Sequence, residues 1–219
     1  MKKEERLKLL AERAEEMKRY EHELRAKGYR LIGGVDEAGR GPLAGPVVAS
    51  CVVLPEDFDV LGVDDSKKLS AKKREELYAL IIERALAVGT GMADNRTIDD
   101  INILQATKLA MIRAVEDADA KLKVPIDFVI FDAMRIDGVE KPQLSLIKGD
   151  QKSVSVGAAS IIAKVTRDRM MKKYDVIYPG YGFAKNKGYG TAEHYEGIKM
   201  SGMTPIHRRS FLRNLREHI

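Results

Sequence analysis

The sequence contains one cysteine, Cys51, and none of its four histidines stands at a metal-ligand spacing. A single cysteine excludes a disulfide framework and a cysteine-rich zinc cluster, and it suits a reducing compartment. Because Cys51 lies inside the apolar run from Val47 to Leu54, we expect a small core residue rather than a nucleophile.

Long apolar runs are also missing. No stretch approaches the ~18 apolar residues of a membrane-spanning helix, and the chain is charged from Lys2 onward, without the apolar core of a secretory signal. Hydrophobic residues make up 44% of the 219 residues and charged residues 32%, with no tryptophan, which is typical of a globular domain. We therefore expect a monomeric, cytoplasmic protein with no membrane partner.

Charge is unevenly distributed along the chain, although the net charge is only +5. Residues 29–150 hold 16 basic and 21 acidic side chains, whereas residues 151–219 hold 13 basic and 5 acidic ones. An acidic segment followed by a basic one is the distribution expected of an enzyme that holds a cation beside a polyanion.

Two adjacent carboxylates, Asp36 and Glu37, follow the apolar run from Tyr29 to Val35. The run predicts a buried strand that delivers both acids to its end. Successive strand side chains point to opposite faces, so both acids can serve one site only where the pleat breaks down, and we expect the following glycines and prolines to supply that break. Adjacent carboxylates repel each other, so a divalent cation explains the pair; an Asp-Glu turn is the alternative.

A glycine-framed arginine follows these acids, in the segment Gly39-Arg40-Gly41. Its glycines lack the spacing of a nucleotide-binding loop, and no Gly-Lys-Ser or Gly-Lys-Thr sequence occurs, so an ATP or dinucleotide site is not supported. Glycines do let a backbone approach a sugar closely, where amides can meet the 2′-hydroxyl that distinguishes RNA from DNA.

The rest of the chain alternates predicted strands and helices, which indicates an α/β domain. Residues 3–27 predict one charged helix ended by Gly28, so residues 1–28 form an N-terminal helical extension that we expect to dock on the domain or to aid binding. Periodicity and capping residues predict a strand at 47–54 paired with the first one, a helix at 71–87 capped by Ser70, a strand at 88–92, a helix from Asp99 or Asp100 to 121, strands at 128–131 and 144–147, and a helix at 156–174.

Two more acids follow predicted strands: Asp132 ends one strand, and Asp150 comes shortly after the next. Functional acids at strand ends are typical of such sheets, whereas the alternative is that these acids only begin turns. Phosphodiester hydrolysis with two cations requires three or four carboxylates that converge from different segments. Asp36, Glu37, Asp132 and Asp150 meet this requirement.

Seven distinctive segments follow one another along the chain. They are Asp36-Glu37-Ala38-Gly39-Arg40-Gly41-Pro42, Asp65-Ser66-Lys67-Lys68-Leu69, Asp132, Lys148-Gly149-Asp150, the run from Ala158 to Arg169, Lys187-Gly188-Tyr189, and His207-Arg208-Arg209-Ser210-Phe211. With these motifs in this order, the sequence from about Tyr29 to Arg216 resembles the type 2 ribonucleases H, usually called ribonuclease HII. Arg40 favours this family over the related ribonuclease HIII family, which lacks that arginine.

The resemblance implies the ribonuclease H-like fold, a mixed sheet flanked by helices, with a helical C-terminal region and a catalytic domain at residues 29–219. It also implies an endoribonuclease that hydrolyses the RNA strand of RNA/DNA hybrids and incises 5′ to single ribonucleotides embedded in duplex DNA, as ribonucleotide removal requires. The implied cofactor is Mg²⁺ or Mn²⁺, bound as two ions by Asp36, Glu37, Asp132 and Asp150. The implied products carry 3′-hydroxyl and 5′-phosphate ends.

The resemblance also assigns two substrate contacts. In the family, the loop that matches Gly39-Arg40-Gly41 meets the 2′-hydroxyl, and the tyrosine that matches Tyr189 packs on the deoxyribose after the ribonucleotide. From the residues alone, a glycine-flanked tyrosine on a loop is equally well explained as a surface anchor.

Several hydroxyl and ammonium groups offer phosphate contacts, with solvation as the alternative for each. These groups belong to Ser66, Lys67 and Lys68 before one predicted helix, and to Ser160 and Lys164 within another. A basic C-terminal stripe suited to a phosphate backbone consists of His207, Arg208, Arg209, Arg213 and Arg216. We interpret Asp168 as structural, because the arginines on both sides of it offer ion pairs.

Two other functions are alternatives to an endoribonuclease. A non-catalytic module that binds hybrids would not need the complete set of four acids. A nuclease of the same fold that acts only on DNA would not need the Arg40 loop and Tyr189.

Overall fold

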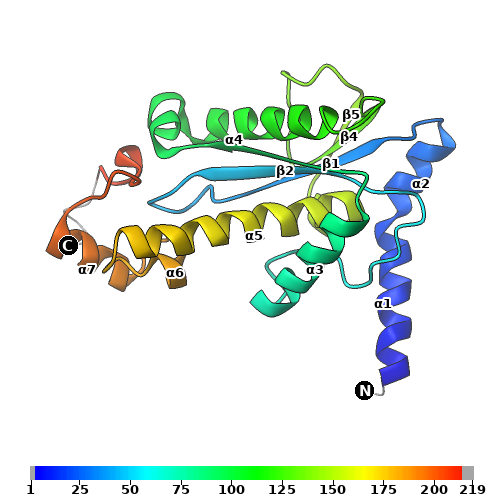
Figure 1. Ribbon diagram of the computed structural model, residues 1–219. Coiled ribbons are helices and arrows are strands. Elements are labelled where there is room, and N and C mark those ends of the chain that lie inside the picture. The colour runs from blue at the N-terminus through cyan, green and yellow to red at the C-terminus, as the bar shows by residue number, and fades with distance from the viewer. Residues whose placement is uncertain (1–2, 214–219) are drawn as a thin grey trace.

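The computed structural model describes residues 3–213, which contain one sheet with helices around it (Figure 1). In chain order the elements are α1 (Lys3–Met17), α2 (Arg19–Ala26), β1 (Ile32–Ala38), β2 (Val47–Val53), α3 (Ala71–Arg84), β3 (Ala87–Ala93), α4 (Asn95–Asp119), β4 (Phe128–Asp132), β5 (Gln143–Leu146), the 3₁₀ helix η1 (Gly149–Gln151), α5 (Val154–Ile177), α6 (Phe183–Asn186), α7 (Ala192–Ser201) and the 3₁₀ helix η2 (Arg209–Phe211). In this part of the chain no helix has the length and apolar character needed to cross a bilayer.

The five strands within residues 3–213 form one mixed sheet, in the spatial order β3-β2-β1-β4-β5. β1, β2 and β3 pair in antiparallel fashion, whereas β4 runs parallel to β1 and β5 runs parallel to β4. The α/β class and the pairing of the first two strands are therefore confirmed. Because β1 and β4 are parallel, their carboxyl ends meet at the same edge of the sheet.

Helices cover both faces of the sheet, with α4 on one side and α5 on the other (Figure 1). Alternate residues of β2 contribute to the two layers: Cys51 and Val53 are buried with residues of α4, whereas Val52 is buried with residues of α3 and α5. Since neighbouring strand side chains point to opposite faces, a strand that is apolar throughout requires a cover on both sides. The prediction of Cys51 as a core residue is confirmed by its complete burial.

The start predicted for the long helix after β3 is wrong. α4 begins after Asp94, whose carboxylate accepts a hydrogen bond from the backbone amide of Thr97 at 2.8 Å, and not after Asp99 or Asp100. The helix is also interrupted at Asn102, which has a φ of 67°. The element therefore has two starts, and the acids at 99 and 100 lie in its first segment, before the interruption.

Two other helices differ from their predicted ends. α3 ends at Arg84, three residues early, because the chain becomes extended at Ala85 and enters β3 at Ala87. Its predicted cap is confirmed, since the Ser70 side chain accepts a hydrogen bond from Lys73 N at 3.2 Å. α5 begins two residues before its predicted start, after a cap by Ser153.

The N-terminal extension consists of two helices rather than one, because the helix is interrupted at Lys18. Figure 1 shows α1 projecting beside the layer that contains α3. The extension nevertheless docks on the rest of the chain: Met17 is fully buried in the cluster formed by β2, α3 and α5. Leu24 is buried with Ile32 and Phe128 of β1 and β4.

β1 and α5 approach each other closely at Gly34. A β-carbon at Gly34 would lie 2.2 Å from the backbone carbonyl carbon of Ser155 and 2.3 Å from the nitrogen of Val156, so only glycine fits. This close approach brings α5 directly over the strand that carries Asp36. As a result, the Ser160 hydroxyl lies close enough to Asp36 to favour its charged carboxylate.

Candidate active site

Asp36 and Asp132 come next to each other at the edge where β4 ends. The parallel register pairs Val35 with Phe131, and these two acids are the next residues on their strands. β1 does not end at Val35 as predicted: it continues through both acids to Ala38 and stays paired with β2, so the pleat does not break at Glu37. The break comes only at Gly39, whose φ is 98°. β4, in contrast, ends at Asp132, so β1 has no paired strand on its β4 side next to Glu37.

Asp150 reaches the same edge through the short helix η1. The chain leaves β5, turns at Lys148 with a φ of 58°, and enters η1 at Gly149. The backbone amide of Gly149 donates a hydrogen bond to Oδ1 of Asp132 at 2.6 Å. This contact ties the Asp150 segment to the end of β4, so acids from β1, β4 and η1 are brought together.

Burial and mutual repulsion disfavour the charged forms of the two acids of β1. Burial, followed by the charges of Glu37 and Asp132, raises the pKa of Asp36 well above its ordinary value, although the Ser160 hydroxyl opposes this shift. Burial also raises the pKa of Glu37, against the attraction of Arg40, whose Nη1 lies 3.6 Å from Glu37 Oε1. A divalent cation would offset this repulsion.

A further acid, Asp65, belongs to this cluster and was missed as a site residue by sequence reasoning. Burial, then the charge of Asp132 and then that of Asp65, raises the pKa of Asp150 to about 6. Asp65 is itself buried and accepts a hydrogen bond from Lys67 N at 2.9 Å. The sequence signal that could have identified Asp65 was its position as the first residue of the motif Asp65-Ser66-Lys67-Lys68-Leu69.

Lys67 places a positive charge among these acids. Burial acts to lower the pKa of Lys67, but the nearby carboxylates together outweigh it and raise that pKa. The carboxylates, in decreasing order of effect, are Asp36, Asp150, Asp65 and Asp132. A single ammonium group thus partly compensates a cluster of acids that carries more negative charge than it can neutralise.

The donor set suits a hard divalent cation, because carboxylate oxygens are the ligands that Mg²⁺ and Mn²⁺ prefer. Within residues 3–213, no three His, Cys, Asp or Glu side chains already stand close enough together to enclose a metal ion. Mg²⁺ is commonly held through one or two carboxylates, several waters and substrate phosphates rather than by a protein cage. The four predicted acids therefore fit a cation that takes its remaining ligands from water molecules and from nucleic acid.

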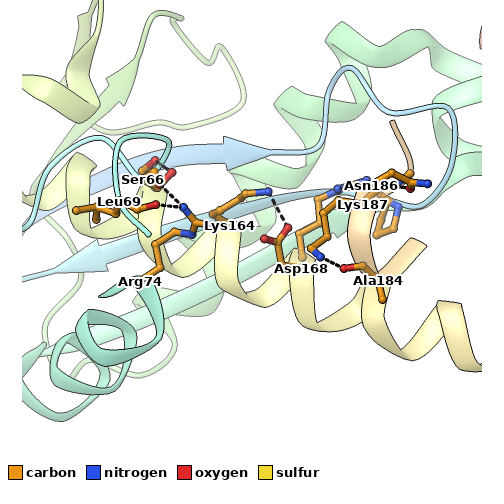
Figure 2. Close-up of polar contacts among 12 residues, drawn as sticks. Ser66, Leu69, Arg74, Lys164, Asp168, Ala184, Asn186 and Lys187 are labelled. Atoms are coloured by element: carbon orange, nitrogen blue, oxygen red, sulfur yellow. Dashed lines mark hydrogen bonds and ion pairs between the residues drawn. The ribbon is translucent and has the colours of Figure 1, made fainter. Parts of the chain in front are cut away.

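The predicted hydroxyl contacts, Ser66 and Ser160, lie side by side. Their Oγ atoms are 2.9 Å apart and both side chains are buried next to the acids. Arg74 holds the turn that carries Ser66, since its Nη1 donates hydrogen bonds to the carbonyl oxygens of Ser66 and Leu69 (Figure 2). The second motif is thereby fixed to α3 and α5.

Asp168 has a structural partner other than the one predicted. Its carboxylate pairs with Lys164 at 2.7 Å, one turn earlier on α5, as Figure 2 shows. The flanking arginines have other partners: Arg169 pairs with Glu75, and Arg167 donates to backbone carbonyls. Lys164 also lines the cleft formed by Glu37 and the glycine loop, and its ion pair with Asp168 holds its ammonium group there.

Two buried arginines support the glycine loop from behind. Arg208 donates hydrogen bonds to the carbonyl oxygens of Gly39 at 2.6 Å and Arg40 at 2.9 Å. Arg167 lies under Gly39 so closely that a β-carbon there would stand 2.0 Å from Nε, and Gly39 has a φ of 98°. Burial lowers the pKa of Arg167 to about 10 and that of Arg208 to about 9, so both keep their charge at neutral pH.

The predicted phosphate contact of Arg208 is therefore wrong for this structure. Arg208 and His207 are 0% and 2% exposed, and the guanidinium group of Arg208 donates to the carbonyl oxygens of Gly39, Arg40 and Gly45, so it is not available to a phosphate. Arg209 and Arg213 are exposed, and their phosphate contacts stay predictions. Arg216 lies outside the described residues.

Tyr189 and the glycine loop line one cleft. The cleft has a volume of about 610 Å³, and its lining also includes Glu37, Lys67 and Ser160. Tyr189 is 48% exposed, so its ring is accessible from the cleft. The cleft thus extends from Glu37, past the glycine loop, to an exposed aromatic ring.

The N-terminal extension contacts the segment that carries Asp150. Nη2 of Arg13 donates a hydrogen bond to the carbonyl oxygen of Gln151 at 2.6 Å. Glu21, which is 1% exposed, accepts hydrogen bonds from Ser153 Oγ at 2.5 Å and Ser155 N at 3.0 Å, at the start of α5. The extension therefore supports η1 and α5 from outside the sheet.

Comparison with known sequences identifies relatives along most of the chain. The family model of ribonuclease HII matches residues 33–214. Ribonuclease HII of Enterococcus faecalis (strain ATCC 700802 / V583) is 59% identical over 196 residues, covering 90% of this chain and 75% of that protein. Ribonuclease HII of Ligilactobacillus salivarius (strain UCC118) is 59% identical over 191 residues, covering 87% and 73%.

Solved structures agree with the sequence comparison. Ribonuclease H2 from Pyrococcus horikoshii OT3 superposes with a TM-score of 0.69 at 31% identity, covering 85% of this chain and 97% of that one. Bst-RNase HIII in complex with Mn²⁺ shares the fold, with a TM-score of 0.62 at 22% identity, covering 84% and 65%. The predicted ribonuclease H-like fold is thus confirmed. The chain belongs to the ribonuclease HII family of divalent-metal-dependent endoribonucleases, which act on RNA/DNA hybrids.

Proposed function

We propose that this enzyme incises duplex DNA on the 5′ side of a single embedded ribonucleotide, in addition to cutting the RNA strand of hybrids. The products would carry 3′-hydroxyl and 5′-phosphate ends, and the incision would begin ribonucleotide removal from DNA. The observation that carries the proposal is one cleft whose lining joins Glu37 of the acid cluster, the glycine loop and Tyr189.

We propose that residues 29–219 form the catalytic domain and that Asp36, Glu37, Asp132 and Asp150 hold two divalent cations. When bound, such cations activate a water molecule and stabilise the leaving oxygen. The raised pKa values of Asp36, Glu37 and Asp150 support this assignment, because acids that repel one another gain from a shared cation. The carboxylate ligands suit Mg²⁺ and Mn²⁺ alike.

The remaining polar groups near the acids would bind the phosphate chain. Lys67 is exposed and close to four carboxylates, so its ammonium group can meet a phosphate next to the scissile bond. The hydroxyls of Ser66 and Ser160 can donate to the same phosphate region, and Lys164 contributes a charge farther along the cleft. The buried charges of Arg167 and Arg208 add positive potential behind the loop.

The Gly39–Gly41 loop would recognise the ribose. Gly41 is exposed at the cleft, and a backbone without a side chain lets amides approach a 2′-hydroxyl. Arg208 donates to the loop carbonyls of Gly39 and Arg40, and Arg167 donates to the Pro46 carbonyl behind the loop, so the cleft side of the loop is left for the sugar. Such a rigid support favours discrimination between ribose and deoxyribose.

Tyr189 would sense the sugar that follows the ribonucleotide. A tyrosine ring provides a flat surface for a deoxyribose, where an additional hydroxyl of a ribose would be less well accommodated. The exposed ring of Tyr189 beside the loop suits this contact. The monomeric state and the cytoplasmic location stay predictions from composition.

The test compares initial rates on three duplexes of equal length: all-DNA, DNA with one ribonucleotide, and an RNA/DNA hybrid. We expect the wild type to cut the second and third and to leave the first intact. Tyr189→Ala should lose ~1 to 3 kcal/mol of transition-state stabilisation on the single-ribonucleotide duplex, by analogy with base stacking on an aromatic ring, and less on the hybrid. Equal losses on both substrates would remove Tyr189 from junction recognition, and Tyr189→Phe serves as the control that keeps the ring.

A further inference from the structure

Two buried histidines, His194 and His207, connect Tyr189 to the C-terminal segment. Their Nε2 atoms lie 2.9 Å apart, and their side chains are 0% and 2% exposed. Both rings contact the aromatic rings of Tyr181 and Phe183. Neither histidine takes part in the proposed chemistry, yet the pair lies between two segments that line or support the cleft.

The outer hydrogen bonds of this pair determine where its protons lie. Nδ1 of His194 is 2.9 Å from the carbonyl oxygen of Tyr189, which can only accept, so this nitrogen carries a proton. Nδ1 of His207 is 2.8 Å from the backbone amide of Thr204, which can only donate, so this nitrogen carries none. For two neutral rings, His207 Nε2 then donates to His194 Nε2, and every ring nitrogen has a partner.

The result is a directed chain of hydrogen bonds from Thr204, through both imidazoles, to the backbone of Tyr189. A proton added to any of the acceptor nitrogens would break one of these bonds. Burial, followed by the neighbouring His194, lowers the pKa of His207 to about 4, so the neutral pair persists at physiological pH. An apolar pair would fill the same space without any of this directionality.

The same segment also supports the glycine loop. Arg208, the residue after His207, donates to the carbonyl oxygens of Gly39 and Arg40, and its own amide donates to Leu43 at 2.8 Å. The histidine pair and Arg208 therefore fix the two proposed sugar contacts, the loop and Tyr189, against one common segment of backbone.

We propose that His194 is a positioning residue for ribonucleotide recognition: together with His207, it sets the backbone of Tyr189 relative to the Gly39–Gly41 loop. This inference rests on the proposed role of Tyr189 as the sensor of the junction. It assigns to a buried, non-catalytic pair a share of the selectivity for a single ribonucleotide over a continuous hybrid.

The first experiment measures kcat/KM on the single-ribonucleotide duplex and on the RNA/DNA hybrid, and uses their ratio as the readout. His194→Leu removes both ring contacts. His194→Asn places an amide donor near the position of Nδ1 and can keep the bond to the Tyr189 carbonyl. Ile198→Ala is the matched control, because Ile198 lies on the same helix, is 3% exposed and packs in the neighbouring apolar cluster.

We expect the ratio to fall at least about fivefold in His194→Leu, the lower limit of what a lost stacking contact costs. It should recover in part in His194→Asn and stay unchanged in Ile198→Ala, even if that variant melts at a lower temperature. If Tyr189→Ala lowers the ratio and His194→Leu does not, the inference is overturned and the proposed function stands. If Tyr189→Ala itself leaves the ratio unchanged, the sensor role fails and the inference fails with it.

A second experiment needs no substitution that risks the fold. In wild-type protein labelled with ¹⁵N-histidine, imidazole nitrogen shifts at neutral pH report which nitrogen carries the proton. We expect His194 to be protonated on Nδ1 and His207 on Nε2, with both rings neutral. The opposite tautomers, or a charged ring, would show that the chain of hydrogen bonds to Tyr189 does not exist and would overturn the proposal.

Discussion

The ring of Tyr189 lies against Gly41: a β-carbon built on Gly41 would stand 3.4 Å from Cε1 of the ring. That distance is an ordinary van der Waals contact, and Gly41 is exposed. Gly39, two residues earlier, is different, since a β-carbon there would collide with Arg167 at 2.0 Å, in a backbone conformation with a φ of 98°. The two glycines of one loop therefore serve separate purposes, one for the cleft and one for the fold.

Alanine substitution should separate these purposes. Gly41→Ala should change the free energy of unfolding by less than about 0.5 kcal/mol, yet lower kcat/KM on the single-ribonucleotide duplex about tenfold or more, because its methyl group occupies the cleft side of the loop. Gly39→Ala should lower stability by about 2–4 kcal/mol through strain and overpacking. Urea denaturation and initial rates measure both effects; comparable stability losses in the two variants would contradict this division.

Removing one carboxylate charge should abolish turnover without loss of fold. Asp36→Asn and Asp132→Asn keep the shape of each side chain but remove a proposed metal ligand, so kcat should fall by about 100-fold or more. The same changes relieve repulsion among buried acids, and the metal-free variants should unfold at the same or a higher urea concentration than the wild type. Duplex binding measured by fluorescence anisotropy should persist. Near wild-type turnover in either variant would argue against the proposed two-metal site.

The N-terminal extension should influence the metal requirement. Arg13 holds the Gln151 carbonyl next to Asp150, so Arg13→Met should raise the Mg²⁺ concentration at half-maximal rate by about 3- to 10-fold, as is usual for groups that orient metal ligands. The control is Arg19→Met on the same extension, because Arg19 is mostly exposed and its partners in the structure, Glu23 at 3.8 Å and the ring of Tyr20, both lie on its own helix. Equal Mg²⁺ requirements in both variants would limit the extension to a role in docking.

Acidification should destabilise the protein through His207. Its pKa is about 4 in the fold, below the ordinary value of 6.5, so the unfolded chain binds more protons between these two pH values. This contribution is fully present above about pH 6.5 and is lost as the pH falls towards 4, amounting to about 2 kcal/mol between pH 7 and pH 5. Asp150, whose pKa is raised, changes stability in the opposite direction over the same range.

The His207 contribution can be isolated with His207→Asn, which keeps an acceptor for Thr204 N and does not titrate. The difference in unfolding free energy between wild type and variant should shrink from pH 7 to pH 5. A difference that stays constant over this range would mean that His207 titrates alike in the folded and unfolded chains.

The proximity of Asp36 and Asp132 was predictable from the two apolar runs that precede them. Asp36 and Asp132 each come directly after an apolar run, and the parallel register of two such strands brings them together. The start of α4 was harder to predict, since Asp94, Asp99 and Asp100 are all plausible caps and only Asp94 accepts from the helix.

The contacts of the basic side chains were not predictable. The sequence predicts Arg208 as part of an exposed basic stripe, but its side chain donates hydrogen bonds to carbonyl groups more than 160 residues away in the sequence. Backbone carbonyl partners cannot be recognised in a sequence, because every residue carries a carbonyl group. Asp65 was missed for a related reason: it follows no predicted strand, and only the tertiary fold brings it beside Asp150.

The most direct test of the central claim is to map the ends produced from a DNA duplex that contains one ribonucleotide. With Mg²⁺ and a label on each end of the modified strand, we predict a single cut at the phosphodiester 5′ to the ribonucleotide. One fragment should carry a 3′-hydroxyl and the other a 5′-phosphate followed by the ribonucleotide. A cut on the 3′ side of the ribonucleotide, a cyclic phosphate end, or cleavage of the all-DNA duplex at a comparable rate would contradict the proposed recognition and chemistry.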